Sequence, residues 1–297
     1  MKNLMLIVNP AAGRGGYKYN FGEAMAALGE GGFCTSLYFT AGRGDAIDFA
    51  AEHAKGYDVV ACVGGDGTLS ELISGLMRLA PEERPPIGYF PMGTTNDVAN
   101  TIGLPKNSTV EAARRIVRGT PHEYDVGGFN GEAYFAYVAA FGAFTEVSYE
   151  TPQSRKKALG HLAYVLGGAS ALQRIEGIDA RIEYDGGVVE GRFLYGSMTN
   201  STSIAGIMKL PNGMVSLGDG ESELVLVRDP GSLDGLSEII SSAITQKYDS
   251  ENLLILHTKS AKFSFDKPVA WTRDGEAGGE YQELTLTNHK AAVKLIF

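Results

Sequence analysis

A glycine-rich turn between an apolar run and an amphipathic segment constrains the fold of this chain more than any other feature. The run Val59–Val63 predicts a buried strand, and Gly64-Gly65-Asp66-Gly67-Thr68 follows it directly. A helix is predicted over 68–80, because apolar side chains recur there at helical spacing: Leu69, Leu72, Ile73, Leu76 and Leu79. Glycines at such a turn admit a ligand close to the backbone, and the helix start offers N–H groups to an anion. Taken alone, the segment also fits a plain turn with an N-capping aspartate.

Two more turns of this kind lie within the first hundred residues. Asn9-Pro10-Ala11-Ala12-Gly13 follows a predicted strand at 4–8, and Pro91-Met92-Gly93-Thr94-Thr95-Asn96-Asp97 follows one at 87–90. A further predicted strand at 34–39 ends at Thr40, and helices are expected near 18–29, 44–54, 95–102 and 108–118. Short apolar strands that alternate with helices predict a parallel sheet with both faces covered. The turns then gather at the carboxyl edge of that sheet, where ligands bind.

The pattern changes near residue 121, where strand-like runs replace the alternation. Strands are predicted near 122–128, 133–141, 180–184, 188–199, 223–228, 252–257, 260–265, 281–286 and 291–296, with helices near 158–174 and 233–245. This succession is typical of an antiparallel sandwich or barrel. We therefore predict an α/β domain with a parallel sheet at 1–121 and a mainly antiparallel β-sandwich domain at 122–297. The sequence leaves open whether 291–297 returns to the first domain.

Composition excludes several classes of protein. A net charge of −9 argues against a nucleic-acid binder that relies on a broad basic surface, so no nucleic-acid partner is expected. No apolar run approaches the roughly 18 residues of a membrane span, and we expect a cytoplasmic protein without a transmembrane segment. Cys34 and Cys62 lie in apolar strand-like runs and are expected to be reduced core residues. The five histidines lack the paired spacing of a zinc site.

A late triplet, Asp274-Gly275-Glu276, follows an apolar segment that ends at Trp271. Together with the three turns, it resembles the diacylglycerol kinase catalytic domain family, which includes sphingosine and ceramide kinases and bacterial soluble lipid kinases. The resemblance implies an NAD kinase/diacylglycerol kinase-like fold and an ATP- and Mg²⁺-dependent kinase acting on a lipid hydroxyl, with diacylglycerol as the first candidate. It also implies peripheral contact with a membrane surface, and it leaves a homodimer open. The alternatives are an NAD kinase-like small-molecule kinase, since NAD kinases share Gly-Gly-Asp-Gly-Thr, and a non-catalytic nucleotide- or lipid-binding regulator.

By the same resemblance, particular residues receive roles in phosphoryl transfer. Asp66 and Asp97 would organise Mg²⁺, and Glu276 would be the general base that deprotonates the lipid hydroxyl. ATP would be bound by residues of the turns: Asn9, Pro10, Ala11, Ala12, Gly13, Thr40, Gly64, Gly65, Asp66, Gly67, Thr68, Gly93, Thr94 and Asn96. Simpler roles stay open: a helix N-terminal charge for Asp97, an N-cap for Thr40 and a plain turn for the late triplet.

A second metal site is implied by Ser216, Asp219 and Glu221. These residues resemble a loop that binds a structural Mg²⁺ in some bacterial diacylglycerol kinases. Hard cations prefer such oxygen ligands, although a plain turn explains the three residues equally well.

Four further positions are weaker matches to the family. Arg14, and Lys156 or Lys157, would contact phosphate or an acidic lipid surface, with solvated surface charges as the alternative. Asp125 matches a position near the nucleotide and fits a strand-edge charge equally well. The chain also departs from the family at Ala12, where many relatives have serine, so that one hydroxyl donor is missing.

Overall fold

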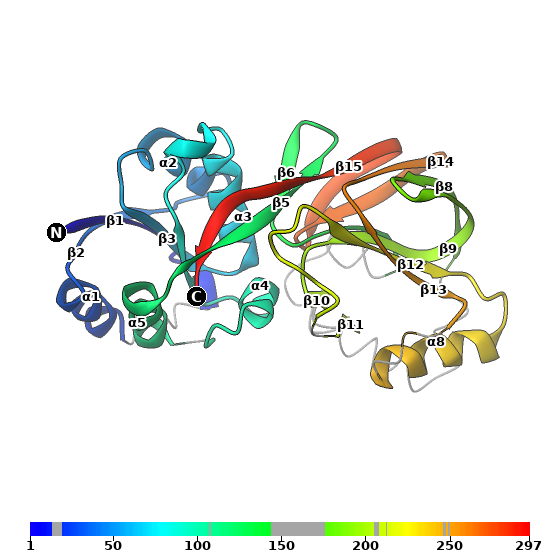
Figure 1. Cartoon of the computed structure of the whole chain (residues 1–297), viewed down its shortest axis with the longest axis horizontal. Coiled ribbons are helices and arrows are strands. Elements are labelled where there is room, and N and C mark those ends of the chain that lie inside the picture. The colour runs from blue at the N-terminus through cyan, green and yellow to red at the C-terminus, as the bar shows by residue number, and fades with distance from the viewer. Residues whose placement is uncertain are drawn as a thin grey trace. The chain divides into compact units, whose positions relative to one another are not determined.

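The computed structural model describes residues 1–13, 20–106, 108–143, 176–204, 208–211, 213–245, 248 and 250–297. The chain divides into two compact units, which Figure 1 shows as ribbons. Unit 1 consists of Met1–Val126, Leu217–Gly220 and His289–Phe297, and unit 2 consists of Gly127–Ser216 and Glu221–Asn288. Residues 291–297, which the sequence left unassigned, are thus part of the unit that holds the glycine-rich turns.

Unit 1 alternates strands and helices close to the predicted positions. In chain order these are β1 (Lys2–Val8), α1 (Phe21–Glu30), β2 (Phe33–Phe39), α2 (Asp45–His53), β3 (Val59–Gly64), α3 (Asp66–Leu76), η2 (Pro81–Glu83), β4 (Ile87–Pro91), α4 (Asp97–Thr101) and α5 (Thr109–Arg118). Strand β1 pairs in parallel with β2 and β3, and β3 pairs in parallel with β4. Near the chain end, Leu295 of β15 (Glu276–Ile296) pairs in parallel with Ile87. Strands paired in this way end at the same edge, so their following turns lie near one another.

Three strands of unit 1, β1, β3 and β4, are largely buried, whereas β2 is half exposed. All six residues of β3 are buried, as expected for a strand packed on both faces. On one face, a core cluster joins β1, α1 and α5 through Leu4, Leu6, Val8, Ala24, Leu28, Ala112 and Ile116. Helices α2 and α3 pack so closely that a Cβ on Gly75 would lie 2.3 Å from the Ile47 carbonyl oxygen. Figure 1 shows α1 and α5 on one side of the strands and α2 on the other.

Unit 2 is built mainly of antiparallel strands. In chain order it contains the end of β5 (Pro121–Phe129), β6 (Ala133–Phe135), β7 (Val138–Gly142), β8 (Ile178–Tyr184), β9 (Gly187–Thr199), β10 (Ser203–Ile204), β11 (Met208–Lys209), β12 (Ser222–Arg228), α8 (Leu233–Thr245), β13 (Leu253–Thr258), β14 (Ser260–Arg273) and the first part of β15. The long strands organise it: β9 pairs with β7, β8 and β12, and β14 pairs with β7, β8 and β15. The predicted antiparallel pairing of this half is confirmed, whereas its arrangement as a β-sandwich stays a prediction.

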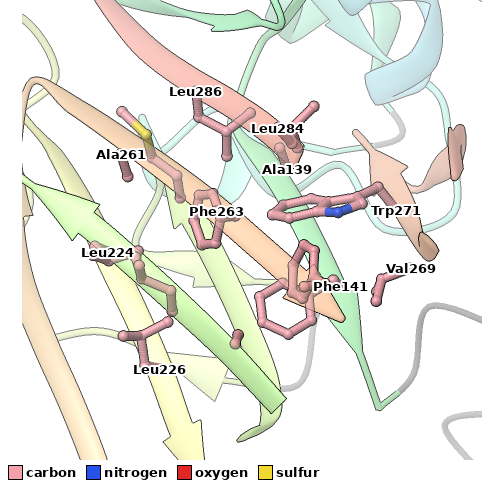
Figure 2. Packing of buried hydrophobic residues seen from close by; sticks show 14 of the residues in the cluster. Ala139, Phe141, Leu224, Leu226, Ala261, Phe263, Val269, Trp271, Leu284 and Leu286 are labelled. Atoms are coloured by element: carbon pink, nitrogen blue, oxygen red, sulfur yellow. The ribbon is translucent and has the colours of Figure 1, made fainter. Parts of the chain in front are cut away.

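An aromatic core anchors the strand that leads to the late triplet. The Trp271 indole of β14 is fully buried, with its ring centroid 4.9 Å from that of Phe263 and 5.0 Å from that of Phe141. Figure 2 shows these rings packed beside Leu284 and Leu286 of β15. Aromatic side chains bury large areas and lose little freedom, so β14 is held firmly up to the turn that follows it.

Parts of the second half differ from the sequence-based expectation. The predicted strands at 281–286 and 291–296 are one 21-residue strand, β15, with a positive φ of 48° at Ala291. The strand predicted at 260–265 continues to Arg273, past an irregular register between Ser264 and Val269 that interrupts the alternation. The helix predicted at 158–174 lies outside the described residues, whereas the one at 233–245 is confirmed as α8. In the described ranges, no helix combines the length and apolar character needed to cross a membrane.

Candidate active site

The first and second turns are joined by the side chain of Asn9. Its backbone N–H donates to the Val63 carbonyl at the end of β3 (3.0 Å). Its side-chain amide donates to the Thr68 hydroxyl of α3 (3.1 Å), while its Oδ1 accepts the Ala11 N–H (2.9 Å). Asn9 therefore fixes the bend of its own loop and the place of the Thr68 hydroxyl at the same time.

The third turn contacts the other two through backbone atoms. A Cβ built on Gly93 would lie 2.5 Å from the Gly65 Cα, and one built on Gly13 would lie 2.5 Å from the Met92 carbonyl oxygen. The Met92 N–H also donates to the Gly64 carbonyl (2.7 Å). Gly13 adopts φ of 55°, which glycine accepts without strain. Three segments that are far apart in the sequence thus meet with no room for side chains between them.

Asn96 shapes the third turn from inside. It is fully buried, adopts φ of 52° and is the N-cap residue of α4. Its Oδ1 accepts the Gly93 N–H (2.9 Å) and the Tyr89 hydroxyl (3.3 Å), and its Nδ2 donates to the Gly93 carbonyl (2.9 Å). Asparagine adopts this left-handed backbone more readily than most residues, which suits it to the position. A contact between Asn96 and phosphate stays a prediction.

Two buried carboxylates start neighbouring helices at this edge of the sheet. Asp66 is the first residue of α3 and Asp97 the first residue of α4, with exposed fractions of 8% and 0%. The Asp66 Oδ1 accepts the Val98 N–H of α4 (3.3 Å), which links the two helix starts. Burial, followed by the charges of Asp66, Cys62 and Asp97, raises the pKa of the Tyr89 phenol well above its ordinary value. Tyr89 therefore stays protonated as a donor beside both carboxylates.

Thr40 lies where β2 ends beside β1. Its N–H donates to the Val8 carbonyl (3.0 Å), and its hydroxyl lies 3.5 Å from the same oxygen. The loop that follows is held by Asp45, whose Oδ2 accepts the N–H groups of residues 41 (2.6 Å) and 42 (2.9 Å). The N-cap of α2 is Gly44, so the alternative role of Thr40 as an N-cap is wrong.

Sequence reasoning missed a cation beside the third turn. Lys106 is exposed, and its Nζ donates to the Thr95 carbonyl (2.9 Å). The neighbouring Thr94 is also exposed, so a positive charge and a hydroxyl are both accessible at this turn. No local pattern marks Lys106, because the contact depends on the way the chain folds back after α4.

The loop predicted to bind a structural Mg²⁺ is held in part by Asp125. This residue is fully buried, its Oδ2 accepts the Gly220 N–H (2.7 Å), and its backbone N–H donates to the Leu217 carbonyl (2.6 Å). Across the residues that the structure describes, no three His, Cys, Asp or Glu side chains gather as a metal site. Metal binding stays a prediction for the three residues named for it: Ser216, Asp219 and Glu221.

The late triplet forms a tight hairpin between β14 and β15 in unit 2. Arg273 pairs with Glu276, and the residues between them, Asp274 and Gly275, have φ of 49° and 75°. Positive φ at both central positions is the geometry of a type I′ hairpin, for which Asp-Gly is a favoured sequence. The triplet thus forms a turn, and Glu276 is exposed as the first residue of β15. Its role as a base stays a prediction.

The structure thus gathers the three turns, Asp66 and Asp97 in unit 1 and places Glu276 in unit 2. Three basic residues that the sequence singled out lie outside the described residues: Arg14, Lys156 and Lys157.

Sequence comparisons identify relatives along nearly the whole chain. Residues 3–129 match the model of the diacylglycerol kinase catalytic domain. The chain is 31% identical over 280 residues to the diacylglycerol kinase of Bacillus subtilis (strain 168), an alignment that covers 94% of this chain and 91% of that protein. It is 35% identical over 283 residues to the diacylglycerol kinase of Staphylococcus aureus (strain MRSA252), covering 94% and 87%.

Solved structures share the fold. A chain from Bacillus anthracis (strain Sterne) aligns with a TM-score of 0.84 at 27% identity and covers 100% of this chain and 95% of its own length. A diacylglycerol kinase crystal structure from the same strain aligns with a TM-score of 0.77 at 24% identity, covering 100% and 97%. With its late Asp-Gly-Glu hairpin and three converging turns, the chain belongs to the diacylglycerol kinase catalytic domain family and is a lipid kinase.

Proposed function

We propose that this lipid kinase transfers the γ-phosphoryl group of ATP to the hydroxyl of diacylglycerol, in a Mg²⁺-dependent reaction that yields phosphatidic acid and ADP. The observation that carries the proposal is the meeting of three glycine-rich turns with two buried carboxylates, Asp66 and Asp97. The relatives from B. subtilis and S. aureus are both called diacylglycerol kinase, which favours diacylglycerol among lipid alcohols.

The phosphates of ATP are proposed to lie at the turns that contain Gly13, Gly65 and Gly93. Glycine keeps backbone N–H groups accessible to a ligand, and the N-terminus of α3 adds a partial positive charge. Two hydroxyls complete the site: Thr68, which Asn9 holds in place, and Thr40 at the end of β2. Together these groups offer donors to phosphate oxygens from several directions, which is how kinases neutralise the charge of the transferred group.

Asp66 and Asp97 are the proposed ligands of Mg²⁺, directly or through water. Carboxylate oxygens are what this hard cation prefers. The charges of both buried carboxylates raise the pKa of Tyr89, and two such charges repel each other. A cation beside them is therefore favourable, so these two residues fit Mg²⁺. Bound Mg²⁺ would supply neutralisation of the phosphate charge.

Glu276 is the proposed general base. Its carboxylate takes the proton of the diacylglycerol hydroxyl while the hydroxyl oxygen forms its bond to the γ-phosphorus. The bond between that phosphorus and the bridging oxygen breaks, and ADP leaves with the electron pair. Exposure of Glu276 on a short hairpin suits a base that must meet an acceptor brought by a membrane. The protein would work from the cytoplasm by peripheral membrane contact, as a monomer or a homodimer.

The experiment is a transfer assay with purified protein and radiolabelled ATP. Mixed micelles present diacylglycerol, monoacylglycerol, sphingosine or ceramide in parallel, and NAD is offered in solution. Each reaction is run with Mg²⁺ and with EDTA. We expect label in phosphatidic acid only when Mg²⁺ is present. Transfer to NAD instead would favour the small-molecule kinase, and the absence of transfer to every acceptor would favour a regulator.

A further inference from the structure

We infer that Asp274 is a positioning residue for phosphoryl transfer, because its side chain fixes the hairpin that carries Glu276. The inference rests on the proposed role of Glu276 as the base. Aspartate in an exposed turn is ordinarily solvated, yet the exposed fraction of Asp274 is 4%. Its carboxylate is turned into unit 2, whereas Glu276, two positions later, is exposed.

The Asp274 carboxylate accepts three successive backbone N–H groups. Its Oδ2 accepts that of Ala136 (2.6 Å), and its Oδ1 accepts those of Tyr137 (2.9 Å) and Val138 (3.1 Å). The Asp274 N–H donates in return to the Val138 carbonyl (2.9 Å). Successive N–H groups that converge in this way make an anion-binding nest, which the chain fills with its own carboxylate. Such charge-assisted bonds are stronger than bonds between neutral groups.

These bonds attach the hairpin to the start of β7 and the bend before it. Residues 136 and 137 form the bend between β6 and β7, and β7 pairs with β14 as far as Arg273. The Tyr137 carbonyl accepts the Thr199 hydroxyl (2.6 Å) and the Asn200 N–H (2.9 Å) at the end of β9. The peptide group between Tyr137 and Val138 therefore connects the Asp274 carboxylate to β9, because its N–H donates to Asp274 and its carbonyl accepts the Thr199 hydroxyl. The turn is therefore held by the hydrogen bonds from residues 136–138 as well as by the two strands that it joins.

The chemistry of the turn shows why a carboxylate is needed. Asn-Gly fits a type I′ hairpin as well as Asp-Gly does, so the backbone alone does not require aspartate. An amide has one acceptor oxygen, and its NH₂ group would face one of the three N–H groups as a second donor. Asp274→Asn would thus keep the turn but lose at least one hydrogen bond to the bend between β6 and β7. A misplacement of about 1 Å at a reacting group can cost on the order of a hundredfold in rate.

The test is a double-mutant cycle on the full chain, with the lipid acceptor that the wild-type protein uses. It compares Asp274→Asn, Glu276→Gln and the double variant, with Asp266→Asn as the matched control because this aspartate of β14 is exposed. Asp274→Asn is expected to lower kcat by about tenfold or more while KM for ATP changes by less than about twofold. In the Glu276→Gln background, the same change should lower kcat by less than about threefold, because the group it positions is already absent. Asp266→Asn should match wild type.

The outcomes separate this inference from the proposed base. If Glu276→Gln keeps nearly wild-type kcat, the base assignment fails and the role of Asp274 falls with it. If Glu276→Gln is inactive and Asp274→Asn is not impaired, only the present inference is wrong. The inference is also wrong if Asp274→Asn lowers kcat by the same factor in the Glu276→Gln background as in the wild-type protein. Circular dichroism checks folding, and Asp274→Glu, which keeps the charge but displaces it by one methylene, enters the same cycle if the asparagine variant does not fold.

Discussion

Gly65 and Gly93 meet backbone against backbone: a Cβ on Gly93 would lie 2.5 Å from the Gly65 Cα, and a Cβ on Gly65 would lie 3.1 Å from the Gly93 Cα. This contact joins the turn after β3 to the turn after β4. Asp66 and Asp97 follow these glycines and start α3 and α4, so the spacing of the two carboxylates depends on the contact.

Gly93→Ala is expected to destabilise the protein and to weaken ATP binding. The added methyl group would overlap the Gly65 backbone, and overpacking of this kind costs about 1–3 kcal/mol. Gly29→Ala in α1 is the matched control, because its added Cβ would meet nothing within 4 Å and alanine favours a helix. Thermal unfolding and KM for ATP are measured on both. The account of the contact is wrong if the two variants behave alike.

Asn96→Gly is expected to lower stability although glycine tolerates the left-handed backbone. The change removes a buried side chain that bonds both polar groups of Gly93, and loss of such bonds costs about 1–3 kcal/mol. Asn130→Gly is the control, since Asn130 has a similar φ of 56° but is exposed. Urea unfolding of both variants measures the difference. Equal midpoints would contradict a structural role for the Asn96 side chain.

The elements of unit 1 could be predicted because their signals are local. The run Val59–Val63 and the helical spacing after it specify β3 and α3 within two residues at their starts and four at their ends. The contact of Gly65 with Gly93 could not be predicted in the same way, because it depends on strand order rather than on any one segment. The sequence could place both turns at one edge but could not give their separation.

The role of Asp274 could not be predicted for a different reason. A type I′ turn is signalled by Asp-Gly itself, so the residues already had a sufficient explanation. The three N–H groups that the carboxylate accepts come from residues 136–138, which are remote in sequence. In the same way, no pattern around Lys106 indicates its contact with Thr95. Side-chain contacts across such distances follow from the folded chain and not from periodicity.

Cys62 is expected to resist alkylation in the folded protein. It is fully buried in β3, and burial together with the Asp66 charge raises the pKa of its thiol, so the reactive thiolate is scarce. Cys34 is exposed. A thiol reagent at pH 8 should therefore modify one cysteine per folded chain and both after unfolding. Rapid modification of Cys62 in the folded protein would show that β3 is not buried as described.

The same thiol should make stability fall at alkaline pH. Above the ordinary thiol pKa of 9.0, the unfolded chain loses the Cys62 proton while the folded chain keeps it. The folded state then binds more protons, so the free energy of unfolding decreases as pH rises. Cys62→Ala should show a shallower decrease between pH 8 and pH 10 than wild type in urea unfolding. Equal slopes would contradict the raised pKa.

Asp66→Asn is expected to abolish turnover in a folded protein. The amide keeps an Oδ1 that can accept the Val98 N–H, so the link between α3 and α4 survives while the proposed metal ligand is lost. Asp48→Asn is the control, because this exposed aspartate of α2 makes a surface ion pair with Arg78. Activity is measured over a range of Mg²⁺ concentrations. Nearly wild-type activity in folded Asp66→Asn would remove this residue from the metal site.

The central claim is that Glu276 takes the proton of the lipid hydroxyl while ATP is held by the turns of unit 1. The most direct measurement is kcat and ATP affinity on the same folded Glu276→Gln variant. Loss of a general base lowers kcat by about 10²–10⁴-fold, and ATP affinity should stay close to that of wild type because the turns are unchanged. A loss of kcat below about tenfold, well under the general-base range, would contradict the account and assign the proton to another group.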